Sequence, residues 1–224
     1  MHIPLRKLKA NEATSYSYSK SGRLPTRMRY LDFESYQGWL PIRKYIVVSD
    51  MYRSAESSLW AIENRKGALP PGKSGHGFGR SIDLDIKRSM KNLGFKRKRQ
   101  LDDWMAARGW FCHRSDHRMK HEAWHYNYFG VDTKWSKLAL KTRWRSVVLE
   151  KLLKHLYGKQ FKLTAKQVQG YLKELKLYGG AIDGKLGPIS KQAIKAFQRT
   201  WKLGADGVAG PKTKRVLAFV TATH

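Results

Sequence analysis

Residues 74–83 read Ser-Gly-His-Gly-Phe-Gly-Arg-Ser-Ile-Asp, and this stretch decides how the first part of the chain is expected to fold. Its alternate glycines predict a turn in which the backbone passes close to neighbouring groups. Residues 82–86 then alternate apolar and acidic side chains, which is the pattern of a strand with one buried face. The stretch therefore predicts a tight turn that presents His76, followed by a strand that presents Asp83.

Strand and helix patterns alternate on both sides of this stretch. Ser54 is expected to cap a helix that carries Leu59, Trp60 and Ile62, and Gly109 to close the helix predicted at 97–108. The first 30 residues are basic and serine-rich and are expected to be an irregular lead-in. The mixture predicts an α+β domain, whose further strands fall at 45–48, 82–86 and 124–129.

A short repeat marks the last 60 residues. Residues 182–188, Ile-Asp-Gly-Lys-Leu-Gly-Pro, return at 205–211 as Ala-Asp-Gly-Val-Ala-Gly-Pro. Each Asp-Gly predicts a tight turn, and each Gly-Pro predicts the start of a helix. With an earlier helix that carries Val168 and Leu172, the pattern predicts a small all-α three-helix domain. Before it, residues 146–157 predict an amphipathic basic helix, interpreted as a connector in preference to a membrane-surface helix.

Composition limits the classes of function. The 224 residues include 45 Lys and Arg against 17 Asp and Glu, a net charge of +28, which predicts attraction to anionic partners. A single cysteine, Cys112, excludes an intramolecular disulfide framework. The N-terminal residues have no apolar signal core, so synthesis in the cytoplasm without a signal peptide is expected.

Two segments together predict a metal site. Catalytic zinc in proteins takes three ligands from His, Asp, Glu or Cys and keeps an open position for water. His76, Asp83 and His125 supply such a set, and Glu122 supplies a carboxylate that can take a proton from the water. In a regular strand Glu122 and His125 would face opposite ways, so a bend between them is expected.

These residues resemble the zinc peptidases that act on peptidoglycan stem peptides, either as D-alanyl-D-alanine carboxypeptidases or as L-alanyl-D-glutamate endopeptidases. The family pattern S-x-H-x-x-G-x-A-x-D falls on residues 74–83, with Ser81 in place of the usual alanine. A second element, E-x-W-H, falls on residues 122–125, and a third, Tyr-Arg-Ser, on residues 52–54. The repeat at the end of the chain resembles, over residues 162–221, the peptidoglycan-binding domain of many cell-wall hydrolases.

The resemblance implies a role for each residue and a function for the chain. One Zn²⁺ is held by His76, Asp83 and His125, Glu122 is the general acid–base, Arg53 stabilises the oxyanion, and Ser74 and Trp124 contact substrate. The expected domains are a zinc peptidase at 1–135 with its core at about 30–130, a connector at 136–160 and a peptidoglycan-binding domain at 161–224. The implied function is a monomeric, phage-type bacteriolytic endolysin with L-alanyl-D-glutamate endopeptidase activity. It acts on peptidoglycan in the periplasm after membrane breach, with its positive charge attracted to anionic wall or outer-membrane polymers.

Four alternatives stay open. Residues 121–125 also match H-E-x-x-H, the helical zinc motif, which would make His121 and His125 ligands, with Glu150 as a third. The enzyme could instead be a D-alanyl-D-alanine carboxypeptidase. The positive charge alone fits a nucleic-acid-binding protein, but no nucleic-acid motif accompanies it, so no specific nucleic acid is expected. A non-catalytic wall-binding protein is the fourth. Cys112 and the histidines at 113, 117 and 121 receive no site role.

Overall fold

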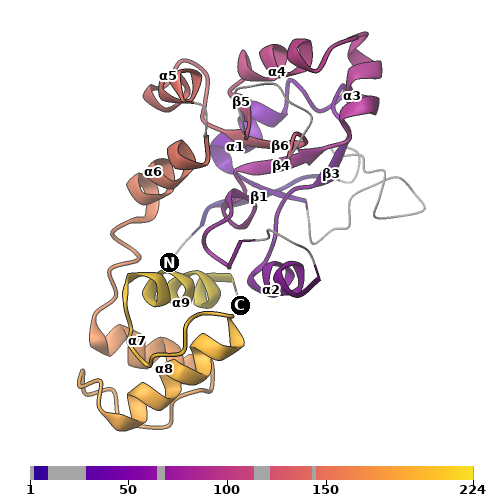
Figure 1. Ribbon diagram of the computed structural model, residues 1–224. Helices are drawn as coiled ribbons and strands as arrows, with labels where there is room; N and C mark the ends of the chain where they lie inside the picture. The colour runs from indigo at the N-terminus through magenta and orange to yellow at the C-terminus, as the bar shows by residue number, and fades with distance from the viewer. Residues whose placement is uncertain (1–2, 10–28, 65–68, 114–121, 143–144, 224) are drawn as a thin grey trace. The chain divides into compact units, whose positions relative to one another are not determined.

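The computed structural model of the protein describes residues 3–9, 29–64, 69–113, 122–142 and 145–223. Its strands are β1 (Leu5–Lys7), β2 (Tyr30–Asp32), β3 (Val48–Asp50), β4 (Ser81–Leu84), β5 (Trp110–Cys112) and β6 (His125–Tyr128). Its helices are α1 (Phe33–Trp39), α2 (Ala55–Asn64), the 3₁₀ helix η2 (Gly75–Phe78), α3 (Ile86–Leu93), α4 (Lys98–Ala106), α5 (Lys134–Lys141), α6 (Arg145–Tyr157), α7 (Ala165–Glu174), α8 (Pro188–Thr200) and α9 (Pro211–Thr223). The described chain is thus mixed α and β (Figure 1).

The chain divides into two compact units, each made of separate stretches of sequence. The larger unit holds residues 4–53 and 78–153, and the smaller holds residues 1–3, 54–77 and 154–224. The boundaries do not follow a single cut along the chain, because the segment 54–77 belongs with the C-terminal residues. Within the described residues, no helix combines the length and the apolar character needed to cross a bilayer.

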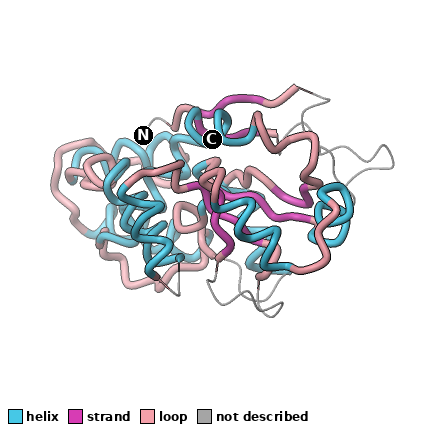
Figure 2. The backbone as a smooth tube through the Cα atoms, turned by 90° about the horizontal axis from the view of Figure 1, so that it is seen from above, coloured by secondary structure: helices cyan, strands magenta, loops and turns pink. Residues whose placement is uncertain are grey.

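The larger unit is built on an antiparallel sheet with strand order β3-β4-β6-β5. Figure 2 shows these strands side by side, and α4 packs against β5. One face of the sheet is apolar and forms the core with α4, because alternate residues of each strand point to the same side. The core residues from these elements include Val48, Ile82, Leu84, Trp110, Cys112, Tyr126, Tyr128, Leu101 and Met105.

Most of the predicted elements are found near their expected positions. The Ser54 hydroxyl accepts the backbone N–H of Ser57 at the start of α2, as a helix cap does. Gly109 follows α4 with a φ of 81°, and β6 ends two residues before Gly130. The apolar side of α6 is buried in the protein, which favours the connector interpretation over a membrane surface; its buried residues include Val148, Leu149, Leu152 and Leu153.

Two local predictions were wrong. The strand expected at 45–48 begins only at Val48, because the N–H groups of Tyr45 and Ile46 donate to the carbonyl of Ile42 in a helical turn after α1. Ile46 is nevertheless buried, so the apolar run marks the core and not a strand. The expected irregular lead-in also contains β1, which pairs antiparallel with β2. A strand of three residues is too short to show an alternating pattern, so neither β1 nor its pairing with β2 could be predicted from the sequence.

The three predicted C-terminal helices correspond to α7, α8 and α9. Pro188 opens α8 and Pro211 opens α9, as expected from the missing N–H of proline. Gly184 and Gly207 adopt φ values of 82° and 78°, in the left-handed region that the two Asp-Gly turns require. Their helices bury a shared apolar set, which includes Val168, Leu172, Ile194, Phe197, Val216, Leu217 and Val220.

Candidate metal centre

The polar face of the β4–β6 pair carries the candidate site. The antiparallel register sets Asp83 opposite His125 and Ser81 opposite Asn127. Because strand side chains alternate, these four residues lie on the face opposite to the core residues Ile82 and Tyr126. Two short strands therefore bring together the carboxylate of Asp83 and the imidazole of His125, which are 42 positions apart in sequence.

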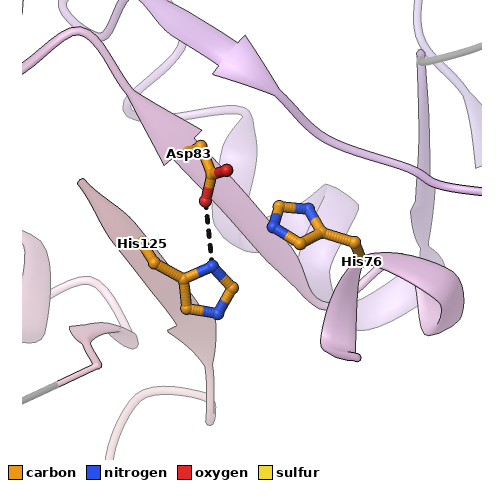
Figure 3. Close-up of side chains that lie close together, drawn as sticks. All are labelled: His76, Asp83 and His125. Carbon is orange, nitrogen blue, oxygen red and sulfur yellow. Dashed lines mark hydrogen bonds and ion pairs between the residues drawn. The ribbon is translucent and has the colours of Figure 1, made fainter. Parts of the chain in front are cut away.

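His76, Asp83 and His125 converge as the sequence predicts. Each offers one possible ligand atom, and these three atoms lie within 4.8 Å of one another. Figure 3 shows the two imidazoles and the carboxylate around one point, with His76 reaching in from η2. His76 and Asp83 are buried, and His125 is partly exposed. Two imidazoles and one carboxylate form a donor set that suits zinc.

The turn before β4 places His76. The Ser74 hydroxyl accepts the backbone N–H of His76 at 3.3 Å, and the Ser74 carbonyl accepts that of Gly77 at 3.2 Å. Ser74 is buried and its hydroxyl is used within the turn. Its observed contact is therefore with the backbone that presents His76.

The carboxylate of Asp83 is held from two sides. One oxygen, Oδ1, lies 2.9 Å from Nδ1 of His125, and the other, Oδ2, lies 3.4 Å from Nη2 of Arg53. The Arg53 guanidinium also donates through Nε to Oδ2 of Asp50 at 2.7 Å. Arg53 thus lies next to Asp83, and its cation contacts two carboxylates.

Electrostatics at His125 favour a positive charge at this point. Burial of the imidazole disfavours its protonated form, but the hydrogen bond and the negative charge of Asp83, with help from Glu122, outweigh it. The pKa of His125 is therefore raised above its usual 6.5. The same carboxylates that favour a proton would favour a bound cation.

The bend expected between Glu122 and His125 is present. Glu122 has a φ of 54°, and the N–H of His125 donates to the Glu122 carbonyl at 2.9 Å, which makes a tight turn before β6. The Glu122 side chain is half exposed, at 49%, and its Oε2 lies 3.9 Å from Nε2 of His113. Trp124, in the same turn, is exposed.

Two further polar groups, which the sequence did not point to, belong to this neighbourhood. The imidazole of His113 follows β5 and contacts that of His125 edge to face, with ring centroids 5.8 Å apart. Asn127 is fully buried, and its Oδ1 lies 3.1 Å from Nε2 of His125. Asn127 could have been predicted from the sequence, because it follows His125 by two positions on one strand and so lies on the same face of the sheet. His113 could not, because only strand pairing brings it there.

The helical interpretation of residues 121–125 is wrong. His125 begins strand β6 and residues 122–124 form a turn, so the one-face helical spacing that H-E-x-x-H requires does not exist here. His121 itself, like His117, lies outside the described residues. Cys112 is buried in the core, where its sulfur lies 3.6 Å from Nζ of Lys98.

Comparisons with known proteins agree with the C-terminal assignment. Residues 164–217 match the family model described as a peptidoglycan binding domain. The N-acetylmuramoyl-L-alanine amidase CwlM of Mycobacterium tuberculosis is 38% identical over 55 residues, 25% of this chain and 14% of that protein. The zinc D-Ala-D-Ala carboxypeptidase of Streptomyces albus G is 54% identical over 33 residues, 15% of this chain and 13% of that protein.

A solved structure shows a looser likeness. The LdcB LD-carboxypeptidase, described with its peptidoglycan recognition, is 16% identical and has a TM-score of 0.44, with 66% of this chain and 78% of that chain covered. The matched stretches span only about one seventh of each curated relative. Residues 164–217 are a peptidoglycan-binding domain, and the chain that carries it resembles the zinc peptidases of the D-alanyl-D-alanine carboxypeptidase family.

Proposed function

We propose that this chain is a zinc peptidase that hydrolyses an amide bond of the peptidoglycan stem peptide, with L-alanyl-D-glutamate endopeptidase activity. One observation carries the proposal: ligand atoms of His76, Asp83 and His125 lie within 4.8 Å of one another. Support comes from the peptidoglycan-binding domain at 164–217, which would keep the enzyme on its insoluble substrate.

The three converging side chains would hold one zinc ion. Bound there, zinc would polarise the scissile carbonyl and lower the pKa of a water molecule toward neutrality. Glu122, which is half exposed and whose charge acts on His125, would take a proton from that water and deliver it to the leaving amine. Arg53 would keep Asp83 oriented and would stabilise the negative charge that develops on the carbonyl oxygen. The exposed ring of Trp124 would lie against the substrate, and Ser74 would act by holding the turn of His76.

The surroundings of the enzyme are part of the proposal. The net charge of +28 supports attraction to anionic wall or outer-membrane polymers, an attraction that salt weakens. We propose a monomer with the role of a phage-type endolysin, made in the cytoplasm and acting on the wall once the inner membrane is breached. We propose that residues 1–135 are the peptidase domain, residues 136–160 the connector and residues 161–224 the peptidoglycan-binding domain.

A D-alanyl-D-alanine carboxypeptidase is the second candidate, favoured by the identity with the Streptomyces albus G enzyme over 33 residues. Mass spectrometry of digested peptidoglycan separates the two activities. Loss of a single terminal alanine indicates the carboxypeptidase, whereas release of whole stem peptides with a new amino terminus indicates the endopeptidase.

Substitution of the proposed general base tests the mechanism. We expect Glu122→Gln to reduce hydrolysis by about 10²–10⁴-fold, because proton transfer by a positioned side chain contributes that much. Zinc content, measured by atomic absorption, and adsorption to purified sacculi should stay at the level of the unmodified protein. EDTA should abolish hydrolysis, and added zinc should restore it.

Glu150→Gln is the matched control, since Glu150 is an exposed acid on α6 that only the rejected helical interpretation makes a ligand. It should leave zinc content and hydrolysis unchanged. Hydrolysis at the normal rate by the Glu122→Gln protein would remove Glu122 from the mechanism.

A further inference from the structure

Behind the candidate ligand His125 lies a buried polar pair that the proposed mechanism does not use. Ser81 and Asn127 face each other across the β4–β6 register, and both side chains are fully buried. The Ser81 hydroxyl donates to Oδ1 of Asn127 at 2.6 Å, and Nε2 of His125 lies 3.1 Å from the same oxygen. One amide oxygen therefore faces a hydroxyl donor and a ring nitrogen.

The two ring nitrogens of His125 face different partners. Nδ1 lies 2.9 Å from Asp83 Oδ1, on the side where the ligand set converges (Figure 3), whereas Nε2 faces Asn127. A neutral imidazole carries one proton, and a nitrogen that binds a metal must keep its lone pair. When a metal displaces the proton that Nδ1 shares with Asp83, the proton on Nε2, donated to Asn127, can stay in place while Nδ1 binds the metal.

The amide of Asn127 has its own directional requirement. With Oδ1 toward Ser81 and His125, its Nδ2 finds no hydrogen-bond partner among the described residues. An unpaired buried donor is costly and is uncommon in protein interiors. The reverse orientation would donate to Nε2 and move the proton to Nδ1, where it would block metal binding. The observed orientation therefore places an acceptor, and not a donor, opposite Nε2 of His125.

We propose that Asn127, supported by Ser81, is a positioning residue that keeps a proton on Nε2 of His125, so that Nδ1 is the nitrogen that binds zinc. This inference rests on the proposed zinc site. It also gives a role to Ser81, the residue that stands where the family pattern has alanine, because an alanine at position 81 would leave Asn127 without its second donor.

Zinc affinity of the full-length protein, measured by competition with a chromophoric chelator, tests the proposal. Removing a group that orients a metal-binding histidine typically weakens metal affinity by about 10–100-fold, and we expect that loss for Asn127→Leu. Ser81→Ala should cause a smaller loss, since Asn127 remains. Asn127→Asp keeps an acceptor toward both partners and should bind zinc at least as tightly as the unmodified protein.

Ser89→Ala is the matched control. Ser89 is also fully buried and its hydroxyl accepts the N–H of Val47 at 3.0 Å, but it lies on α3 and is not part of the ligand set. Zinc affinity should be unchanged in this variant. The visible absorption of the cobalt-substituted protein adds a signature of ligand geometry, which should shift in Asn127→Leu and Ser81→Ala and stay constant in Ser89→Ala.

The outcomes separate this inference from the proposed function. If the unmodified protein binds no zinc, both fail. If it binds zinc and both Ser81→Ala and Asn127→Leu bind equally well, only the positioning role is overturned. Weak zinc binding by the Asn127→Asp protein would also overturn the positioning role, because that variant keeps the acceptor that the proposal requires at position 127. Should Asn127→Leu fail to fold, Ser81→Ala and Asn127→Asp still decide.

Discussion

At the scale of single residues, the candidate centre depends on positions two apart on adjoining strands. Asp83 and Ser81 on β4 meet His125 and Asn127 on β6 because both strands alternate in phase. A shift of one residue in the register would turn the Asp83 or His125 side chain toward the core and turn core residues such as Tyr126 away from it. The chemistry of this site is therefore set by the same pairing that stabilises the sheet.

Gly79 allows the turn that carries His76 to lie close to the backbone at Asp32. Its φ is 66°, and a Cβ placed there would lie 2.6 Å from the backbone nitrogen of Asp32. The Gly79 carbonyl also accepts the N–H of Asp32 at 3.0 Å. No side chain fits this approach, so glycine is required by both the φ angle and the contact.

We expect Gly79→Ala to lower the free energy of unfolding by more than about 3 kcal/mol, because backbone strain and a backbone clash add. Gly94→Ala is the matched control: its φ is 69°, but an added Cβ would meet nothing within 4 Å. Only the strain of about 1–2 kcal/mol should remain there. Urea denaturation of both variants checks the difference, and equal losses would show that the contact at Gly79 is unimportant.

At the scale of elements, the two Asp-Gly turns of the three-helix domain use the same device. The Gln169 amide donates to Oδ1 of Asp183 at 2.7 Å and accepts the N–H of Gly184 at 2.7 Å. In the second copy Gln198 donates to Oδ1 of Asp206 at 2.7 Å and accepts the N–H of Gly207 at 2.8 Å. The repeat in the sequence therefore encodes a glutamine, buried in a helix, that fixes the following turn.

These turns predict how the domain responds to pH. Hydrogen bonding lowers the pKa of Asp183, chiefly from the side chain of Gln169, and of Asp206, chiefly from the backbone of Val208, below the usual 3.8. A carboxyl whose pKa is lowered by folding stabilises the folded state above pH 3.8, and that contribution is lost as the pH falls through its folded value. We therefore expect the urea concentration at the unfolding midpoint of the domain to decrease as the pH drops below 3.8. The methyl NMR signals of Val216 and Val220 report this unfolding.

The double variant Asp183→Asn, Asp206→Asn is the control for this pH effect. It removes both titrating groups, so its urea midpoint should depend less on pH below 3.8 than that of the unmodified protein. An identical pH dependence in the two proteins would assign the acid sensitivity to other groups.

A buried ionic cluster joins α4 to β6 on the core side of the sheet. The ammonium group of Lys98 contacts Asp102 and donates to the Tyr126 hydroxyl at 2.9 Å, and Tyr126 donates to Asp102. Burial and the charge of Asp102 raise the pKa of Tyr126 well above 10, so its hydroxyl stays protonated. Because Tyr126 lies between His125 and Asn127 in sequence, this cluster fixes the strand that carries both.

At the scale of the whole molecule, the smaller unit joins the peptidoglycan-binding helices to a segment from the middle of the chain. Residues 54–77 pack with residues 154–224, and α2 contacts α9. Arg215 donates through Nε to the Gly72 carbonyl at 2.5 Å, and a Cβ on Gly72 would lie 3.1 Å from that of Phe219. The segment 54–77, which contains Ser74 and His76, therefore packs against α9 at Gly72.

This packing predicts the effect of removing the C-terminal helices. A chain that ends at residue 160 lacks α9, and residues 54–77 then lose the contacts of Arg215 and Phe219. We expect such a chain to lose hydrolysis of a soluble stem peptide as well as adsorption to sacculi. Both are measured with purified protein, the first by chromatography of the products and the second by co-sedimentation.

Arg215→Ala removes the contacts of the guanidinium with Gly72 and Phe161 and leaves Phe219 in place, so it should lower the thermal stability while adsorption persists. A truncated chain that cleaves the soluble peptide at the full rate would mean that residues 54–77 hold their conformation without α9.

Elements whose signals are local could be predicted from the order of residues. Glycine spacing, helix caps and the Asp-Gly repeat each depend on a few neighbouring residues, so the turn at residues 74–79, the start of α2 and the three C-terminal helices could be predicted. The convergence of His76, Asp83 and His125 could be predicted as well, since these residues fall in patterns typical of a metal site.

Contacts between distant groups became visible only in the folded chain. The pairing of β1 with β2, the approach of His113 to His125, the bond between Ser81 and Asn127 and the union of residues 54–77 with α9 all join segments far apart in sequence. Such contacts follow from strand register and from the packing of whole elements, which no local pattern of residues records.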